Sequence, residues 1–446
     1  MKKITLIIFF LFTINFIYAQ TNVSGGIFSN TTWTLAGSPY IVVDTIVVFP
    51  GVTLTIDPGV MVKFADGKYL EIREASLLAT GTSTDSITFT SNSVTPTSGI
   101  WGRIWRNGVS MVSKYNYCNV KYSSQGIYGA DTVKNSNFIL NSFGCSAGYI
   151  DSCNFYNNGT GARGTIFNCN IKHNQTGVSG SFHIKNCQID SNQTGVDVSL
   201  SLIENSSLSY NQIGGKSWIN EDNRYKNCII NNNSIKGIEL SGSGGDSAVN
   251  CQIKFNGIGI DITRGFSQDG ILRNIIDSNS VGIKIGGSFS GGSIYCNKIC
   301  NNTSFDLQLN SNINVNASNN YWCTPDSIST TARIYDGYDN ISLGLVNFMP
   351  LDTSMCYLGL PTGIEVTKNK KLFSIYPNPV SDYLTVINEA STGAQISISN
   401  ILGEKELSSI ITSGKSGINV STLPKGIHFI EVVAGNNISR QKFIKQ

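Results

Sequence analysis

The sequence predicts an all-β protein in which a long solenoid of short strands precedes a small C-terminal β-sandwich. A unit of about twenty residues recurs through the middle of the chain, and units of this size bury their apolar faces only by stacking on one another. After residue 372, short alternating apolar and polar runs are separated by turn residues, a pattern typical of a sandwich. Only 14% of the residues are charged and 45 are glycine, which suits a chain with many turns between strands.

Three positions define the repeat unit. A small or soft residue comes first, an apolar residue follows two positions later, and an Asn follows three positions after that. Residues two apart on a strand point the same way, so the first two positions are expected to face inward. The first positions, which we call the Cys column, are Cys118, Ser136, Cys153, Cys169, Cys187, Ser206, Cys228, Cys251, Asn274 and Cys296. The apolar positions are Val120, Phe138, Phe155, Ile171, Ile189, Leu208, Ile230, Ile253 and Ile276.

The Asn positions indicate a corner at the end of each repeated strand. They are Asn141, Asn158, Asn174, Asn192, Asn211, Asn233, Asn256, Asn279 and Asn301, with Ser123 replacing Asn in the first unit and Lys298 standing where the last apolar residue is due. We expect each Asn to adopt a left-handed backbone conformation. Stacked in register, the Asn side chains should hydrogen-bond along the axis, about 4.8 Å per coil. A Gly and a second strand-like run follow, as in Gly177-Val178 and Gly237-Ile238.

Together these features resemble the right-handed parallel β-helix of the pectate-lyase-like superfamily. The resemblance covers roughly residues 26–350, and we assign 26–357 to the β-helix domain. Its opening coils resemble those of secreted bacterial members in the run Gly51-Val52-Thr53-Leu54-Thr55-Ile56, and its end resembles their closing coil in Asn319-Asn320-Tyr321-Trp322. The resemblance concerns the fold and does not by itself imply an activity.

Both ends of the chain carry features of export. Residues 1–19 read as a signal peptide, with a basic start at Lys2 and Lys3, an apolar run to Tyr18 and a small residue at Ala19. That run is short for a membrane span, and no other stretch is apolar enough to cross a bilayer as a helix. We therefore expect no transmembrane span in the mature protein.

Residues 358–371 read as a polar linker, and residues 372–446 resemble the C-terminal sorting domain of type IX secretion in Bacteroidota. The resemblance implies type IX secretion machinery as a partner, removal of the domain, and attachment to surface lipopolysaccharide. It implies a location outside the cell or on the outer surface of a Gram-negative bacterium. The motifs are Tyr376-Pro377-Asn378-Pro379, Asn400-Ile401-Leu402-Gly403, Leu423-Pro424-Lys425-Gly426-Ile427 and Lys442-Phe443-Ile444-Lys445.

Charge and cysteine usage restrict the other partners. The net charge is +3 and no Lys or Arg run occurs, which argues against nucleic acid or an anionic membrane. Most of the eleven cysteines lie in the Cys column, where we expect buried thiols rather than disulfides or a metal site. Cys323 and Cys356 lie off the column in the closing segment, and we predict a disulfide between them that ties down the last coil.

No catalytic signature is evident. The three histidines, His173, His183 and His428, lack a neighbouring nucleophile and acid in sequence, and we interpret all three as structural or solvated. The paired Asp with His and Arg-x-Lys of polygalacturonase-like proteins is missing, and so is the Arg-x-Pro-x-x-Arg of pectate-lyase-like ones.

One edge of the solenoid nevertheless stands out. Coils from Ser206 onward are longer by about four residues, and insertions in solenoids often line the binding face. On the strand that precedes these insertions, the outward positions on successive coils are expected to be Ser217, Glu239, Asp261 and Lys284. Further candidate ligand-binding residues in and beside the inserted loops are Arg264, Trp218, Phe266 and Phe289.

Two function classes follow from this edge. Glu239 and Asp261, exposed side by side, are suited to Ca²⁺ or to acid–base chemistry, and Lys284 and Arg264 to a sugar carboxylate. The alternative is a solvated polar face without a ligand. We favour a non-enzymatic glycan-binding or adhesive solenoid that uses no cofactor. The runner-up is a polysaccharide lyase or glycoside hydrolase acting on an extended acidic polysaccharide.

Overall fold

The chain forms two compact units, residues Met1–Leu360 and Pro361–Gln446, in a computed structural model. The predicted signal peptide (1–19) and linker (358–371) lie outside the residues that the structure describes. The described residues are 20–108, 112–180, 182–217, 223–241, 246–264, 270–287, 293–324, 326–353, 356, 373–388, 393–400, 404–412, 414–434 and 437–446.

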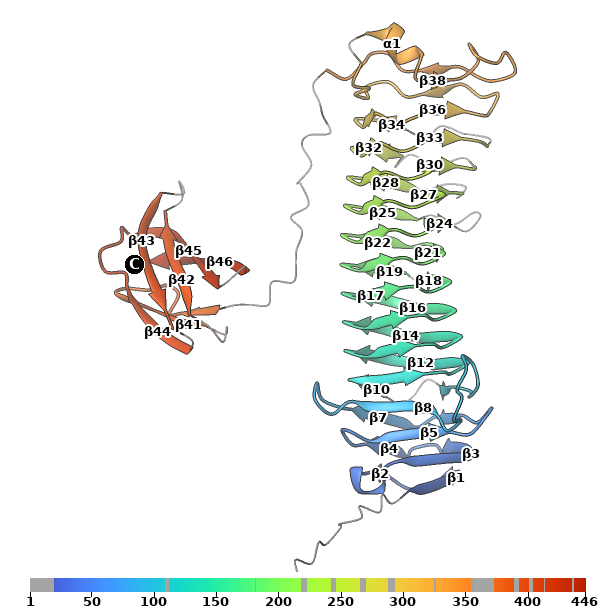
Figure 1. The fold of residues 1–446 in the computed structure, drawn as a ribbon, viewed down its shortest axis with the longest axis vertical. Helices are drawn as coiled ribbons and strands as arrows, with labels where there is room; N and C mark the ends of the chain where they lie inside the picture. Colours follow the sequence, from blue (N-terminus) through green and yellow to red (C-terminus); the bar gives the residue numbers. More distant parts are fainter. Residues whose placement is uncertain are drawn as a thin grey trace, which may run out of the picture. The chain divides into compact units, whose positions relative to one another are not determined.

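The first unit is a parallel β-helix in which coils stack along one axis (Figure 1). Each coil contributes strands to three parallel sheets, which we call faces 1, 2 and 3 in chain order within the coil. Five long strands turn from one face to the next, namely β1 (Thr21–Ile27), β3 (Tyr40–Val48), β12 (Gln125–Lys134), β14 (Phe143–Asp151) and β16 (Thr160–Phe167). A short 3₁₀ turn (Leu35–Gly37) lies in the opening coil.

Face 1 carries the repeated strand that begins at the Cys column. Its other strands are β5 (Met61–Phe64), β8 (Ile87–Ser91), β11 (Cys118–Lys121), β13 (Asn137–Ile139), β15 (Asn154–Tyr156), β17 (Asn170–Lys172), β20 (Gln188–Asp190), β23 (Ser207–Ser209), β26 (Ile229–Asn231), β29 (Gln252–Lys254), β32 (Ile275–Asp277) and β35 (Lys298–Cys300).

Face 2 follows the Asn corner, and face 3 returns the chain to the next coil. Face 2 adds β6 (Leu70–Arg73), β9 (Ile104–Asn107), β18 (Thr176–Ser179), β21 (Thr194–Val198), β24 (Ile213–Ser217), β27 (Lys236–Leu240), β30 (Ile258–Ile262), β33 (Val281–Ile285), β36 (Phe305–Leu309) and β38 (Ile334–Tyr335). Face 3 adds β2 (Thr31–Trp33), β4 (Thr53–Ile56), β7 (Ser76–Thr80), β10 (Ser113–Asn116), β19 (His183–Lys185), β22 (Leu202–Glu204), β25 (Arg224–Lys226), β28 (Ser247–Val249), β31 (Ile271–Leu272) and β34 (Ile294–Tyr295).

The core consists of inward-facing columns of apolar residues, and each column takes one residue from each of its strands. Ile230 pairs with Ile253, both are fully buried, and Lys254 beside them is partly exposed, so the predicted strand phase is confirmed. Each such Ile contributes roughly 1.5–3 kcal/mol by leaving water. The column continues on every coil because successive strands stay in register.

The Asn side chains stack along the axis as predicted. The Oδ1 of Asn233 accepts hydrogen bonds from the backbone N–H (2.9 Å) and the Nδ2 (3.2 Å) of Asn211, while its own Nδ2 donates to Leu208 O and to Asn256 Oδ1, both at 2.9 Å. The prediction that Asn itself is left-handed is wrong for the stacked Asn residues and holds only for Asn301, at 54°, which lies outside the stack. In the stack, the preceding residue has the positive φ, for example Tyr210 at 58°, and this turn points the Asn inward to its partners.

The last repeat is shifted by one residue from the predicted assignment. Ile276 pairs with Ile299, and Asn274 donates to Asn297 Oδ1, so Asn297 rather than Cys296 continues the Cys column. Asn302 rather than Asn301 continues the Asn stack, because Asn279 donates to its Oδ1. Lys298 therefore points outward, and the apparent break in the repeat disappears.

The Gly after each Asn corner is required by the close approach of neighbouring coils. A Cβ on Gly177 would lie 2.5 Å from the backbone oxygen of Gly195, and one on Gly237 would lie 2.5 Å from that of Gly259. No side chain fits at this distance, so the Gly column is a packing requirement.

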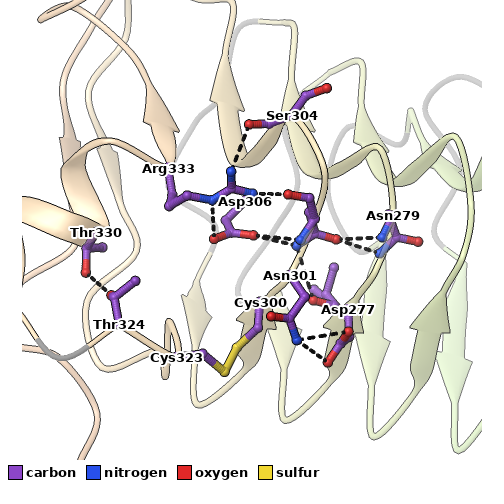
Figure 2. A network of polar contacts seen from close by, with 12 residues as sticks. Asp277, Asn279, Cys300, Asn301, Ser304, Asp306, Cys323, Thr324, Thr330 and Arg333 are labelled. Carbon is purple, nitrogen blue, oxygen red and sulfur yellow. Dashed lines mark hydrogen bonds and ion pairs between the residues drawn. A yellow bond between two sulfur atoms is a disulfide. The ribbon is translucent and has the colours of Figure 1, made fainter.

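A polar cap ends the Asn stack (Figure 2). The Asp306 carboxylate accepts a hydrogen bond from Asn302 Nδ2 at 2.7 Å, where the next Asn would otherwise stand, and it pairs with Arg333 at 3.3 Å. Arg333 also donates to the carbonyls of Ser304 and Asn302. Burial raises the pKa of Asp306, although Asn302 and Arg333 oppose that effect. A short helix, α1 (Ser327–Thr331), and the pair β37 (Val315–Asn316) and β39 (Val346–Asn347) complete this end.

The predicted Cys323–Cys356 disulfide is wrong. Cys323 is bonded to Cys300 and Cys356 to Cys296, with Cα separations of 5.7 and 5.4 Å. Each closing cysteine thus reaches back to the last coil. The one-residue shift frees Cys296 from the column and turns Cys300 to the outer side of its strand, where it is buried and bonded to Cys323. The other column cysteines, Cys118, Cys153, Cys169, Cys187, Cys228 and Cys251, are buried thiols, as predicted.

The second unit contains two antiparallel sheets around its own core. One sheet has the order β40 (Phe373–Tyr376), β41 (Tyr383–Asn388) and β44 (Gly414–Asn419). The other has the order β43 (Lys405–Ile411), β42 (Ala394–Ser399), β45 (Gly426–Ala434) and β46 (Asn437–Lys445). Fully buried Leu384, Ile396 and Phe443 belong to the core between them, consistent with a small sandwich.

Candidate functional site

The predicted outward residues on face 2, Glu239, Asp261 and Lys284, have the expected register, and we call them the face-2 row. Glu239 pairs with Asp261 and Asp261 with Lys284 on adjacent strands β27, β30 and β33. On the preceding coil, however, the residue that pairs with Glu239 is Lys216 and not Ser217. Ser217 is 2% exposed and its hydroxyl contacts Asp246 at 3.3 Å, so it faces inward.

The carboxylates of this row are neither fully exposed nor free. Asp261 is only 5% exposed, contrary to the prediction. The Nζ of Lys236 lies 2.6 Å from Glu239 and 2.5 Å from Asp261. Partial burial favours the neutral amine, but these hydrogen bonds outweigh it and raise the pKa of Lys236. Lys236 pairs with Ile213 and Ile258 on the neighbouring coils, immediately before the corner Gly, and its side chain reaches both carboxylates.

Lys236 weakens both roles assigned to the two carboxylates. An ammonium already occupies the space between them, where Ca²⁺ or a substrate proton would have to sit. Among the residues that the structure describes, no three His, Cys, Asp or Glu side chains come together as metal ligands.

The remaining predicted residues of this edge divide into two groups. Lys284 is partly exposed and Arg264 is exposed, and no ion pair joins either to a described carboxylate. Trp218, Phe266 and Phe289 lie outside the described residues. The cations of the row thus remain available to an anionic ligand, and the aromatic part of the prediction stays untested.

Face 3 carries a second outward surface that sequence reasoning missed. A chain of contacts crosses successive coils there. Lys134 Nζ lies 5.5 Å from the centroid of the Tyr149 ring, and Tyr149 meets Phe167 edge-on at 5.5 Å. Phe167 in turn meets His183 edge-on at 5.0 Å. We call Lys134, Tyr149, Phe167, His183 and Lys185 the face-3 cluster.

A carboxylate closes this cluster. His183 Nε2 lies 3.0 Å and Lys185 Nζ 2.9 Å from Glu204 Oε1. The hydrogen bond from Lys185 is the main cause that lowers the pKa of Glu204. Glu204 is therefore held ionised between two nitrogen groups, which fixes the side chains of His183 and Lys185 beside the aromatic rings.

The outward columns of face 3 are predominantly basic. The strand register places five basic residues on them, Lys114, Lys134, Lys185, Arg224 and Lys226, against Asp151 and Glu204. A signal for this surface was present in the sequence. Lys134, Asp151, Phe167, Lys185, Glu204 and Lys226 each lie two positions before a residue of the Cys column.

The other candidate nucleophiles and histidines have structural surroundings. Burial raises the pKa of the Cys118 thiol to about 12, and it raises that of Cys145 as well, so these thiols remain protonated and unreactive at neutral pH. His173 is exposed at a corner and meets Tyr156 edge-on at 4.9 Å. His428 is buried between Glu406 (2.7 Å) and Pro424 O (2.8 Å).

Comparison with protein families agrees with this architecture. Residues 25–141 match the pectate-lyase like beta helix domain, and residues 374–446 match the secretion system C-terminal sorting domain. The chain joins a pectate-lyase-like β-helix to a type IX sorting domain. The match to the β-helix family ends before most of the face-3 cluster and before the whole face-2 row, so it assigns no role to them.

Two further comparisons concern solved structures and curated sequences. The crystal structure of the periplasmic alginate epimerase AlgG is similar at 12% identity and a TM-score of 0.37, covering 72% of this chain and 84% of that one. A search of curated protein sequences finds no match. The sorting domain indicates export to the cell surface or the extracellular space and an interaction with the secretion machinery. Among the described residues, no helix is long and apolar enough to cross a membrane.

Proposed function

We propose that this secreted β-helix protein is a non-enzymatic glycan-binding solenoid whose ligand is an extended acidic polysaccharide. The observation that carries the proposal is the face-3 cluster, in which the partly exposed rings of Tyr149 and Phe167 lie between Lys134 and the His183–Lys185 pair along the helix axis. Aromatic rings supply apolar area for sugar rings, and ammonium groups pair with carboxylates. Side chains placed one strand spacing apart along the axis suit an extended chain rather than a compact ligand.

The face-2 row supports the same ligand class in an altered form. Its two carboxylates are already paired with Lys236, so Lys216, Lys284 and Arg264 are the groups left to contact an anionic chain. Removing Glu239 and Asp261 together should then strengthen binding of an acidic chain, since it leaves Lys236 without its two counter-ions.

The test is binding of the full chain to a panel of polysaccharides by isothermal titration. We expect oligogalacturonate to bind, and its affinity to fall as salt rises from 50 to about 500 mM, because ion pairs at an exposed surface are screened. Failure of every acidic polysaccharide in the panel to bind would refute the proposal.

Catalysis is the second candidate function, and one contact favours it. His183 Nε2 lies 3.0 Å from Glu204, a pairing that also occurs in acid–base sites. The two functions separate in a turnover assay on the same oligogalacturonate, read as new reducing ends and as unsaturated products. A non-enzymatic binder releases neither, and turnover that is lost in His183→Ala would favour the lyase or hydrolase.

We also propose that the sorting domain is removed before about Phe373 and that the mature protein begins near Gln20 or Thr21 and becomes attached to surface lipopolysaccharide. The family match to the tail supports its recognition by the secretion machinery. Intact-mass measurement of surface-released protein tests the removal. Recovery of a mature protein that still ends in Lys445 and Gln446 would contradict it.

A further inference from the structure

A groove of about 430 Å³ runs along the Asn corner between faces 1 and 2. Its walls come from four successive coils, at the corners that follow β17, β20, β23 and β26. The groove is largely open to solvent, a shape that suits an extended chain lying along the surface. We call it the corner groove, and its outward side chains are His173, Gln175, Gln193, Tyr210, Gln212 and Ser234.

Each corner contributes the same three-residue pattern to the groove. The middle residue is the stacked Asn, whose amide is engaged in the buried hydrogen bonds of the solenoid. The following residue is exposed and is Gln175, Gln193 or Gln212 on three successive coils. The Asn stack fixes the spacing of these Gln residues at that of neighbouring strands, about 4.8 Å.

The three glutamine amides are available to a ligand. No hydrogen bond from a described residue occupies the side chain of Gln175, Gln193 or Gln212. Each primary amide offers two donors and an acceptor with two lone pairs, the set that binds pairs of sugar hydroxyls. Tyr210 is 65% exposed beside them and provides an aromatic face for a sugar ring.

The groove carries no acidic or strongly basic group. None of its lining residues is Asp, Glu, Lys or Arg, in contrast to the basic columns of face 3. The Gln row also has definite ends, because the coil before it has Gly159 and a coil beyond it has Gly257 at the same position, one residue after the stacked Asn. A bounded run of free amides on an otherwise repetitive corner indicates a local site.

We propose that the corner groove binds an extended neutral polysaccharide whose chain runs parallel to the solenoid axis. Gln175, Gln193 and Gln212 hydrogen-bond hydroxyls of successive sugars, and the ring of Tyr210 packs against one sugar face. The site lies on a different edge and takes a different ligand class from the acidic chain assigned to face 3.

The experiment is isothermal titration of the full chain with neutral hexasaccharides of β-linked glucose, mannose and xylose. We expect at least one to bind with an affinity that does not change between 50 and 500 mM salt, since no charged group lines the groove. The double variant Gln193→Ala, Gln212→Ala should weaken that binding at least tenfold, and Tyr210→Ala should weaken it by a similar factor.

The matched control is Gln188→Ala with Gln252→Ala, two outward glutamines on face 1, which should bind as the unaltered chain does. Circular dichroism melting checks that all variants fold. The proposal is overturned if no neutral hexasaccharide binds, or if the Gln193, Gln212 variant binds as tightly as the control. Binding of oligogalacturonate should be unchanged in these variants, so this proposal and that for face 3 fail independently.

Discussion

The inward and outward columns of the same coils follow opposite rules. Inside, the residue type is nearly constant from coil to coil, as in the Asn stack, where Asn211, Asn233 and Asn256 make the same set of hydrogen bonds. Outside, the residue type can differ on each coil, as in the face-3 column that runs through Asp151, Phe167, Lys185 and Glu204.

The difference teaches where to look for function in a solenoid. A buried Asn must satisfy the next coil, so its side chain carries no free hydrogen-bonding capacity, and a change there acts on stability. An outward side chain has no such obligation. It acts on stability only slightly, and its chemistry is available to a ligand.

The largest effect is expected from a charge placed in an inward apolar column. Ile253→Asp should destabilise the β-helix by about 4–5 kcal/mol, since it buries an unpaired carboxylate in place of a fully buried Ile. The outward neighbour Lys254→Asp should cost less than about 1 kcal/mol. Urea unfolding of both variants measures the difference, and equal losses would contradict the observed strand phase.

The next largest effect is expected from the Asn stack. Asn233→Ala removes two donated and two accepted hydrogen bonds and leaves buried partners unpaired, which should cost about 3–4 kcal/mol. Cys228→Ser in the Cys column is the control. Its expected cost is below about 1 kcal/mol, because Ser206 already fills that slot on the preceding coil and accepts from Cys187 N–H at 3.1 Å.

Loss of a closing disulfide should destabilise the protein somewhat less than loss of a stacked Asn. Cys300→Ser with Cys323→Ser opens a loop spanning 23 residues and should cost about 3 kcal/mol by the chain-entropy estimate. Peptide mapping without reduction should find Cys300–Cys323 and Cys296–Cys356 linked. A peptide joining Cys323 to Cys356 would contradict the structure.

The smallest effect is expected in the pH dependence of stability. Hydrogen bonds from Arg73, at 2.8 and 3.0 Å, lower the pKa of the buried Glu71 despite the opposing effect of burial. A lowered folded-state pKa gives stability that is present above the unfolded value, near 4.3, and is lost as pH falls through the folded value. Glu71→Gln should therefore lower the free energy of unfolding by on the order of 1 kcal/mol at pH 7 and change it little at pH 3. A pH-independent loss in thermal melts would argue against this pairing.

The repeat in the sequence predicted most of the inward architecture correctly. Cys228, Ile230 and Asn233 recur at fixed offsets because each must satisfy the coil above it, so the pattern carries the register. The same pattern misplaced the last coil, where Cys296 and Asn301 mimic the repeat one residue early. Only the three-dimensional pairing of Ile276 with Ile299 shows the shift, and that shift decides which cysteines pair.

The outward surfaces were predicted less completely. The register of Glu239, Asp261 and Lys284 follows from the repeat, but the contact of the Lys236 ammonium with both carboxylates depends on the direction of a long side chain, which the repeat does not specify. The face-3 cluster was missed because its members differ in type on each coil, although they share an offset from the Cys column. The corner groove was missed because its Gln residues directly follow the stacked Asn, and the whole corner was interpreted as structural.

The central claim is that side chains of the outward columns bind a polysaccharide, while side chains of the inward columns stabilise the β-helix that carries them. The most direct test measures both the melting temperature and the dissociation constant for oligogalacturonate in two variants of the full chain. Lys134→Ala with Lys185→Ala should weaken binding at least tenfold and leave the melting temperature within a few degrees. Asn233→Ala should lower the melting temperature strongly, while its folded fraction binds as the unaltered chain does. Unaltered binding in the lysine variant would contradict the account.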